Sequence, residues 1–201
     1  MSKLVVNTSL TLDGVMQAPG DPNEDRSGGF QRGGWAQPYF DQVMADAAGD
    51  GIAKGGGIVL GRRTYEHFAS VWPHMPADNQ FTAVLNERQK YVASRTLKEP
   101  LDWRNSTLLT GDAADALATL KEQPGDDLVI LGSGELVRSL MRRNLIDEYR
   151  LLIHPLVLGS GRRLFTDGGP SATLRLVDTK TTTTGVVIAN YEPTEPPPAR
   201  A

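Results

Sequence analysis

The stretch Leu128-Val129-Ile130-Leu131-Gly132-Ser133-Gly134 decides the fold class of this 201-residue chain. Its first four residues are all apolar, so the strand that they predict has no polar face, which is typical of a central parallel strand covered on both sides. Residues 135–142 follow with apolar side chains at helical spacing. The stretch therefore predicts a buried parallel strand that enters a helix through a tight turn.

Short apolar runs and amphipathic stretches alternate on both sides of this unit. We expect strands at residues 4–10, 57–61, 81–85, 90–93 and 107–110, helices at residues 38–48 and through Tyr65 and Phe68, and a further helix capped by Asp112. Residues 148–158, 173–178 and 185–191 are β-like and predict a C-terminal antiparallel hairpin. This order predicts an α/β domain with three layers, α/β/α, around a mostly parallel sheet.

Two glycine-rich segments interrupt the pattern. Residues 14–34 contain six glycines and predict a long mobile loop, and such loops often act as lids or binding loops. Residues 159–163, Gly-Ser-Gly-Arg-Arg, lie between predicted antiparallel strands without a helix start, so we expect a hairpin there.

The composition excludes several classes of function. A formal charge of −3 provides no general cationic surface for nucleic acid or anionic lipid. Zero cysteines exclude disulfides and thiolate chemistry, and the three histidines lack metal-ligand spacing. Without a membrane span or signal-like start, we expect a cytoplasmic protein of one domain, residues 1–192, followed by a Pro-rich disordered tail, residues 193–201.

Three polar turns directly follow predicted strands: Asp13-Gly14, Gly61-Arg62 and Gly132-Ser133. Because ligands of open α/β sheets bind beyond the carboxyl ends of the strands, we expect these turns to form one site. The amides of Gly132-Ser133-Gly134, at a helix start, suit a pyrophosphate, although small residues also serve simple strand-to-helix turns.

Arginines near two of these strand ends suggest a second phosphate. Arg62, Arg63 and Arg95, with Ser94, could grip a 2′-phosphate on adenosine, which favours NADP over NAD, although each arginine is also compatible with a solvated surface. Asp13 is the carboxylate nearest the expected site, or alternatively a simple turn residue. His154, in an apolar strand before Pro155, is interpreted as a core imidazole.

Four segments, in the same order, resemble the dihydrofolate reductase-like superfamily, in particular the reductase domain of the riboflavin-biosynthesis deaminase-reductase. They are residues 9–14 (SLTLDG), 60–66 (LGRRTYE), 90–96 (KYVASRT) and 130–136 (ILGSGEL). The resemblance implies a dihydrofolate reductase-like fold with about eight strands, NADPH as cofactor, and hydride transfer to a C=N or C=O carbon of a pterin-like or pyrimidine-like small molecule.

The resemblance also implies roles for individual residues. Cofactor binding falls on Thr8, Gly14, Met16, Gly61, Arg62, Arg63, Thr64, Ser94, Arg95, Gly132, Ser133, Gly134, Glu135 and Leu136. Apart from the resemblance, Trp35, Tyr39 and Phe40 border the glycine-rich loop and could form a flat-ring pocket for the substrate, although aromatic residues at a helix start also serve the core. Asp13 and Asp41 are the candidates for orienting the substrate or relaying a proton. Family members commonly pair through late strands, so we expect a homodimer.

At one position this sequence differs from the pattern of dihydrofolate reductases. The family's Trp-x-x-Pro element is present as Trp35 to Pro38, but the acidic residue expected two positions later is Phe40, and Asp41 follows one residue late. On a helix one residue is a rotation of about 100 degrees, so Asp41 is not equivalent, and dihydrofolate is not the expected substrate. The leading hypothesis is an NADPH-dependent reductase. The alternatives are a non-catalytic NADP(H)-binding or sensor protein and a purely structural subunit.

Overall fold

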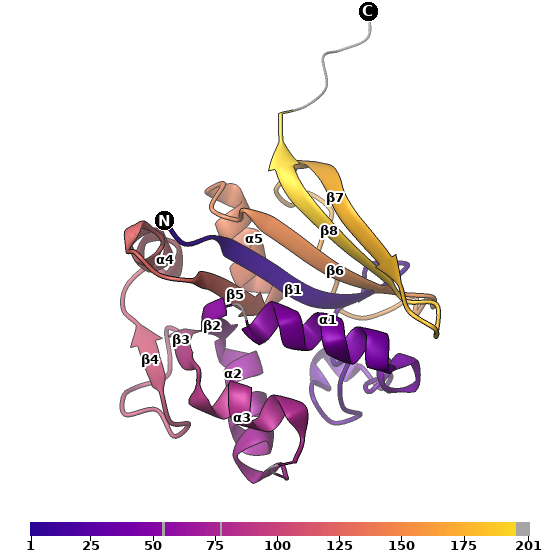
Figure 1. Cartoon of the computed structure of the whole chain (residues 1–201), viewed down its shortest axis with the longest axis horizontal. Helices are drawn as coiled ribbons and strands as arrows, with labels where there is room; N and C mark the ends of the chain where they lie inside the picture. The colour runs from indigo at the N-terminus through magenta and orange to yellow at the C-terminus, as the bar shows by residue number, and fades with distance from the viewer. Residues whose placement is uncertain (54, 77, 196–201) are drawn as a thin grey trace, which may run out of the picture.

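The computed structural model describes residues 1–53, 55–76 and 78–195, in which eight strands form one sheet in the order β4-β3-β2-β5-β1-β6-β8-β7 (Figure 1). The strands are β1 (Leu4–Thr11), β2 (Gly55–Gly61), β3 (Gln89–Ala93), β4 (Ser106–Leu109), β5 (Asp127–Leu131), β6 (Glu148–His154), β7 (Thr173–Thr181) and β8 (Val187–Thr194). The helices are α1 (Gln42–Ala53), α2 (Arg62–Val71), α3 (Gln80–Glu87), α4 (Ala113–Glu122) and α5 (Gly134–Arg142), with short 3-10 turns at Ser27–Gly29, Gln37–Tyr39 and Trp72–His74.

The sheet is parallel from β4 to β6 and antiparallel at its other edge. β8 runs against both β6 and β7, which gives the predicted C-terminal hairpin. The three-layer α/β expectation is therefore confirmed, with a mostly parallel eight-stranded sheet.

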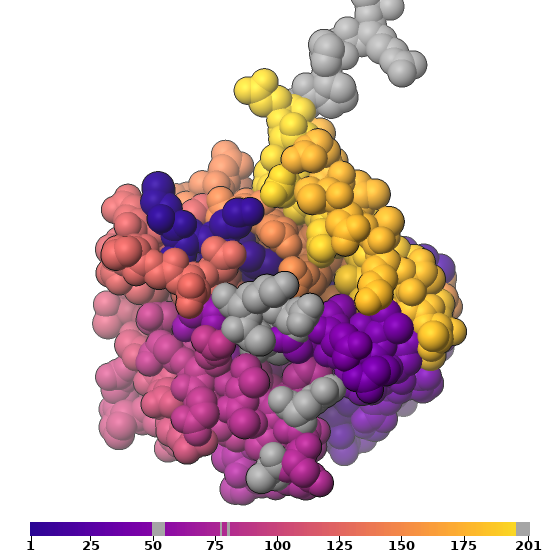
Figure 2. Space-filling view, viewed as in Figure 1, coloured from indigo at the N-terminus to yellow at the C-terminus, as the bar shows by residue number. Residues whose placement is uncertain are grey.

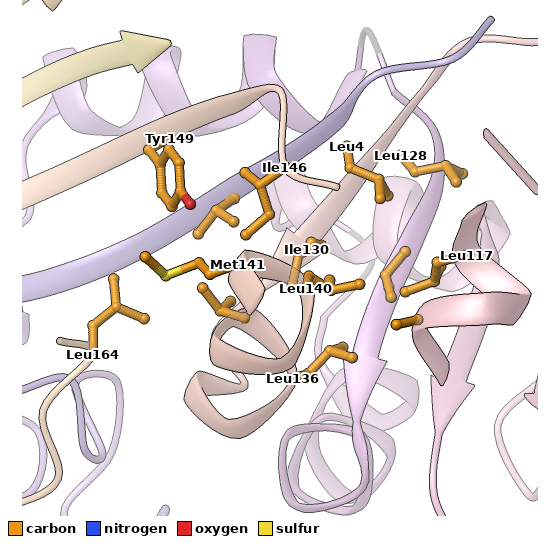
Figure 3. Close-up of a cluster of buried hydrophobic side chains, with 14 of the residues drawn as sticks. Leu4, Leu117, Leu128, Ile130, Leu136, Leu140, Met141, Ile146, Tyr149 and Leu164 are labelled. Atoms are coloured by element: carbon orange, nitrogen blue, oxygen red, sulfur yellow. The ribbon is translucent and has the colours of Figure 1, made fainter. Parts of the chain in front are cut away.

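Strand β5 lies at the centre of two hydrophobic clusters, one on each side of the sheet. Leu128 and Ile130 belong to the cluster that α4 and α5 cover (Figure 3), whereas Val129 and Leu131 belong to the cluster beneath α2 and α3. All four side chains are at most 9% exposed. Burial on both faces is the reason for the uninterrupted apolar run in the sequence.

The predicted strand at residues 81–85 is wrong, because these residues lie in α3. Asn79 caps the helix by accepting a hydrogen bond from the amide of Phe81. A short apolar run does not distinguish a strand from a buried helix, and here the Asn79 cap and the packing of Phe81, Val84 and Leu85 in one hydrophobic cluster decide for the helix.

The helix expected at residues 38–48 is divided. Gln37–Tyr39 forms a separate 3-10 turn, Phe40 is extended (φ −69°, ψ 125°), and α1 begins only at Gln42. Asp41 is therefore the residue that precedes the helix, and its side chain accepts from the amide of Met44 at 2.8 Å. An acidic residue in this position satisfies an otherwise free helical amide.

The hairpin expected at residues 159–163 is also wrong, since β6 pairs with β8 rather than with β7. The segment instead crosses to the turn that follows β1. The amide of Met16 donates to the carbonyl of Arg162 at 2.9 Å, and Val15 forms an isolated antiparallel bridge with Arg163. The basic glycine turn therefore supports the β1 turn.

The glycine-rich loop at residues 14–34 closes on a small core of its own. Val15, Ala18, Phe30 and Trp35 pack together, each at most 7% exposed. The indole N–H of Trp35 donates to the carbonyl of Gln17 at 2.7 Å. The expected mobility of this loop stays a prediction.

At the C-terminal end, β8 continues through Pro193 and Thr194, which pair with Leu174 and Thr173 of β7. The sheet thus extends two residues into the segment expected to be a tail, and residues 196–201 lie outside the described residues. Among the helices of the described ranges, none has the length and apolar character needed to cross a membrane.

Candidate functional site

The turns after β2 and β5 are joined by one side chain. Because β2 and β5 are parallel neighbours, their carboxyl ends lie together. The hydroxyl oxygen of Ser133 accepts a hydrogen bond from the amide of Gly61 at 2.7 Å and lies 3.0 Å from the hydroxyl of Thr64. The predicted convergence of these turns is confirmed, and Ser133 is the residue that locks them together.

Two helices begin at this junction without side-chain caps. Neither Gly61, before α2, nor Ser133, before α5, makes a capping hydrogen bond to its helix. Gly132 and Ser133 both have left-handed backbones, with φ of 58° and 62°. A non-glycine residue in this region is strained, and such strain is concentrated at functional sites. First-turn amides with no internal partner, at the positive ends of two helix dipoles, form a site suited to an anion.

The turn after β1 approaches the same junction through Met16. A Cβ atom built on Gly134 would lie 2.6 Å from the sulfur of Met16 and 3.1 Å from a guanidinium nitrogen of Arg138. The flexible ends of Met16 and Arg138 therefore occupy the space beside Gly134 and would have to shift to admit a larger side chain there. Met16 and Gly134, both predicted to contact the cofactor, are brought together.

Positive charge borders this junction. Arg62 and Arg63 are exposed in the first turn of α2, and Arg62 makes only an exposed contact of 3.4 Å with Glu66. Gly61 pairs in register with Ala93 of β3, so Ser94 and the exposed Arg95 follow at the neighbouring strand end. The side chain of Ser94 accepts from two local amides and so shapes this turn.

Three predicted cofactor residues are less directly placed. The side chain of Thr8 is buried within β1, short of the carboxyl edge. The side chain of Leu136 belongs to the hydrophobic core, so only its backbone can face an anion. Glu135 is exposed in the first turn of α5, where its charge favours the helix dipole.

Asp13 holds two loops together. Its carboxylate accepts from the hydroxyl of Thr11 at 2.6 Å and from the amides of Leu158 and Gly159, and it pairs with Arg163 at 3.3 Å. These donors hold the pKa of Asp13 well below its usual range. The carboxylate of Asp13 therefore fixes the β1 turn to the segment at Leu158 and Gly159, and its expected role in orienting the substrate or relaying a proton stays a prediction.

Asp41 is likewise engaged in the structure. Besides capping α1, its carboxylate accepts from the amide of Thr183 at 2.7 Å, in the turn between β7 and β8. Figure 2 shows this end of the hairpin lying against α1. Asp41 therefore fastens the hairpin to the helix.

Replacing Asp41 by Ala is expected to lower the melting temperature by about 2–4 °C, the usual cost of losing a helix cap in a domain of this size. Hydrogen bonds from Thr183 and Met44 lower the pKa of Asp41. The stabilisation of the folded chain by Asp41 is therefore complete above the ordinary pKa of 3.8. It is lost as the pH falls through the lowered pKa of the folded state. The difference in melting temperature between wild type and Asp41→Ala should therefore shrink when thermal unfolding is measured at decreasing pH from pH 7 into acid. Asp41→Asn, which retains a cap, serves as the control.

Two of the three aromatic residues expected at the substrate, Trp35 and Tyr39, lie around His154. The rings of Trp35 and Tyr39 meet the imidazole edge to face, with centroids 5.1 Å and 5.7 Å away. Phe40 is 55% exposed, and no ring contact joins it to His154 in the described part of the chain. The burial expected of His154 is confirmed, since it is 0% exposed, but its Nε2 has no hydrogen-bond partner among the described residues, so it is not the fully satisfied core imidazole that the sequence suggested.

Comparisons with known proteins identify the family to which the chain belongs. The family model of the RibD C-terminal domain matches residues 2–188. The uncharacterized protein YyaP of Bacillus subtilis (strain 168) is 31% identical over 137 residues, which are 67% of this chain and 72% of that protein.

Solved structures agree in fold. A Shewanella sp. PV-4 protein, assigned provisionally to riboflavin biosynthesis, superposes with a TM-score of 0.64 at 18% identity, over 97% of this chain and 100% of that one. Dihydrofolate reductase from Enterococcus faecalis, complexed with NADP(H) and RAB-propyl, superposes with a TM-score of 0.57 at 14% identity, over 96% and 97%. The dihydrofolate reductase-like fold is thus confirmed. Since the family model covers nearly the whole sequence, the chain belongs to the RibD C-terminal domain family.

Proposed function

We propose that this chain is an NADPH-dependent reductase that delivers hydride to a C=N or C=O carbon of a pterin-like or ribosylamino-pyrimidine small molecule. The observation that carries the proposal is the junction at Ser133, where two uncapped helix starts meet beside Arg62 and Arg63. A pyrophosphate needs donors from more than one direction, and two helix starts supply them. Membership of the RibD C-terminal domain family favours reduction over other nucleotide chemistry.

The residues present fit the cofactor. The amides at the start of α5 would hold the pyrophosphate, with Met16 of the β1 turn packed against Gly134 beside them. Arg63 and Arg95 are the cations best placed for a 2′-phosphate at the ends of β2 and β3. When bound, NADPH supplies the hydride. The β1 turn, held by Asp13 and Arg163, would line the nicotinamide and exclude water.

The test is a thermal-shift titration of the full chain with NADPH and NADH, since a ligand that binds only the native state raises its stability with concentration. We expect a larger shift with NADPH. Arg95→Ala should weaken the binding of NADPH by about tenfold and leave the binding of NADH unchanged, because a charge-assisted hydrogen bond to the 2′-phosphate is lost. Arg142→Ala, an exposed charge in the last turn of α5, is the matched control. Equal shifts for both nucleotides would contradict the 2′-phosphate assignment.

Catalysis is tested separately from binding. Sustained NADPH oxidation with a pteridine or ribitylamino-pyrimidine acceptor supports the reductase. Tight NADPH binding without turnover of any such acceptor would instead favour the non-catalytic sensor, for which the Phe40 departure is the motivating observation.

We also propose that the chain forms a homodimer through its C-terminal hairpin. β7 is an edge strand, and its Leu176 and Val177 are 48% and 50% exposed. An edge strand with exposed apolar residues presents unpaired backbone groups and apolar surface on which another chain can pair. Sedimentation of the full chain as a single-chain species at micromolar concentration would contradict this proposal.

A further inference from the structure

His154 carries a buried hydrogen-bonding atom that nothing in the described part of the chain satisfies. The residue is 0% exposed at the carboxyl end of β6. Its Nδ1 lies 3.0 Å from the carbonyl oxygen of Leu152 and 3.3 Å from that of Leu10. Its Nε2 is buried without a partner. Buried polar atoms are nearly always paired, so an exception of this kind points to a missing partner.

The surroundings determine which kind of partner is missing. Both neighbours of Nδ1 are carbonyl oxygens, which only accept, so Nδ1 must carry the proton. Burial lowers the pKa of His154, which keeps the ring neutral. In the neutral ring with a proton on Nδ1, Nε2 is a bare acceptor. The missing group is therefore a hydrogen-bond donor.

The aromatic cover does not provide that donor. The indole N–H of Trp35 is already committed to the carbonyl of Gln17. Tyr39 packs edge to face on the imidazole, and no hydrogen bond joins the two side chains in the described residues. Tyr39 is itself only half-buried, whereas Trp35 is 7% exposed, so Tyr39 is the more exposed of the two rings against the imidazole.

Position links this acceptor to the site already described. His154 pairs in register with Thr11, the last residue of β1, whose turn carries Asp13 and Met16. The carboxylate expected on the neighbouring helix is absent, because Phe40 occupies its place and Asp41 is bound to Thr183.

We propose that His154 is a substrate-binding residue whose Nε2 accepts a hydrogen bond from a ring N–H of a heterocyclic substrate lying against Trp35 and Tyr39. This inference rests on the proposed function. Because Nε2 of His154 would accept from a ring N–H, the site should prefer heterocycles with a free ring N–H over heterocycles in which that N–H is blocked.

The ring tautomer provides a direct first test. The chain has three histidines, so ¹⁵N-histidine NMR of wild type and His154→Asn assigns the His154 signals. We expect a protonated Nδ1 and an unprotonated Nε2 in the free protein. Addition of lumazine with NADP⁺ should move the Nε2 signal upfield, as acceptance of a hydrogen bond requires. A proton on Nε2 in the free protein would overturn the proposal.

Binding specificity is the second test, with pteridine fluorescence as the readout in the presence of NADP⁺. Wild type should bind lumazine about tenfold more tightly than 1,3-dimethyllumazine, which has no ring N–H to donate. His154→Asn keeps a donor near the Nδ1 position and removes the Nε2 acceptor. The ratio of its affinities for lumazine and 1,3-dimethyllumazine should therefore fall towards one. His74→Asn, at an exposed histidine, should keep the wild-type ratio.

The remaining outcomes are also decisive. If the ratio persists in His154→Asn, steric exclusion of the methyl groups explains it, Nε2 is satisfied by a buried water, and the proposal is overturned. Failure of both pteridines to bind wild type overturns it as well. These readouts are independent of NADPH oxidation, so the reductase assignment can fail while His154 is confirmed, or the reverse.

Discussion

Replacing Ser133 by Asp is expected to weaken NADPH binding by at least about 100-fold. The side-chain oxygen of Ser133 lies between the starts of α2 and α5, within 3.0 Å of both Gly61 and Thr64. A carboxylate at this point would occupy the anion site and repel a pyrophosphate, and like charges placed against each other in a partly buried site cost several kcal/mol. Direct titration of NADPH fluorescence measures the loss.

The matched control is Ser133→Asn, which has the shape of aspartate without its charge and tolerates the left-handed backbone at this position. We expect Ser133→Asn to lose much less affinity than Ser133→Asp. Thermal unfolding of both variants without ligand checks that the junction still folds. Equal affinities for NADPH in the two variants would show that the phosphates bind elsewhere.

Replacing Lys90 by Met is expected to lower the free energy of unfolding by about 3 kcal/mol, the largest effect on stability that we predict for a single side chain. Lys90 is 0% exposed, yet its ammonium group donates to the carbonyls of Leu85, Asn86 and Arg88 at the end of α3. It also lies 4.4 Å from the ring centroid of Trp103. Methionine fills the space but leaves these buried carbonyls without their donor.

Burial lowers the pKa of Lys90 to about 8, and the ammonium is therefore still the main form at pH 7, where the comparison is made. Urea denaturation of wild type and Lys90→Met gives the difference in unfolding free energy. Lys98→Met, at an exposed lysine, is the control and should stay within about 0.5 kcal/mol of wild type. A similarly small change for Lys90→Met would mean that water replaces the ammonium.

Local patterns predict most of the sheet, apart from the run at residues 81–85, and the meeting of the turns after β2 and β5. The all-apolar run of β5 predicts burial on both faces, and the structure confirms it, because a strand between two helical layers has no polar side. The turns after β2 and β5 were predicted to meet because the carboxyl ends of parallel strands share one edge. Asp112 was recognised as a cap because its side chain satisfies amides within its own helix.

Tertiary structure decided what depends on neighbours distant in sequence. The role of Ser133 as an acceptor for Gly61 requires that β2 lie beside β5, and the chain order does not specify that adjacency. The occupied carboxylates of Asp13 and Asp41 depend on loops more than 140 residues away. The run at residues 81–85 is helical because of a cap and of packing that periodicity over five residues does not reveal.

His154 shows the same division between local and distant information. Its apolar neighbours predict burial, which the structure confirms. Which of its nitrogens is paired depends on carbonyls from both β1 and β6 and on rings from a separate turn. Hydrogen bonding is directional and is satisfied by whatever the fold brings near, so a sequence pattern reports that a polar group is buried, and only the folded chain determines whether it is left for a ligand.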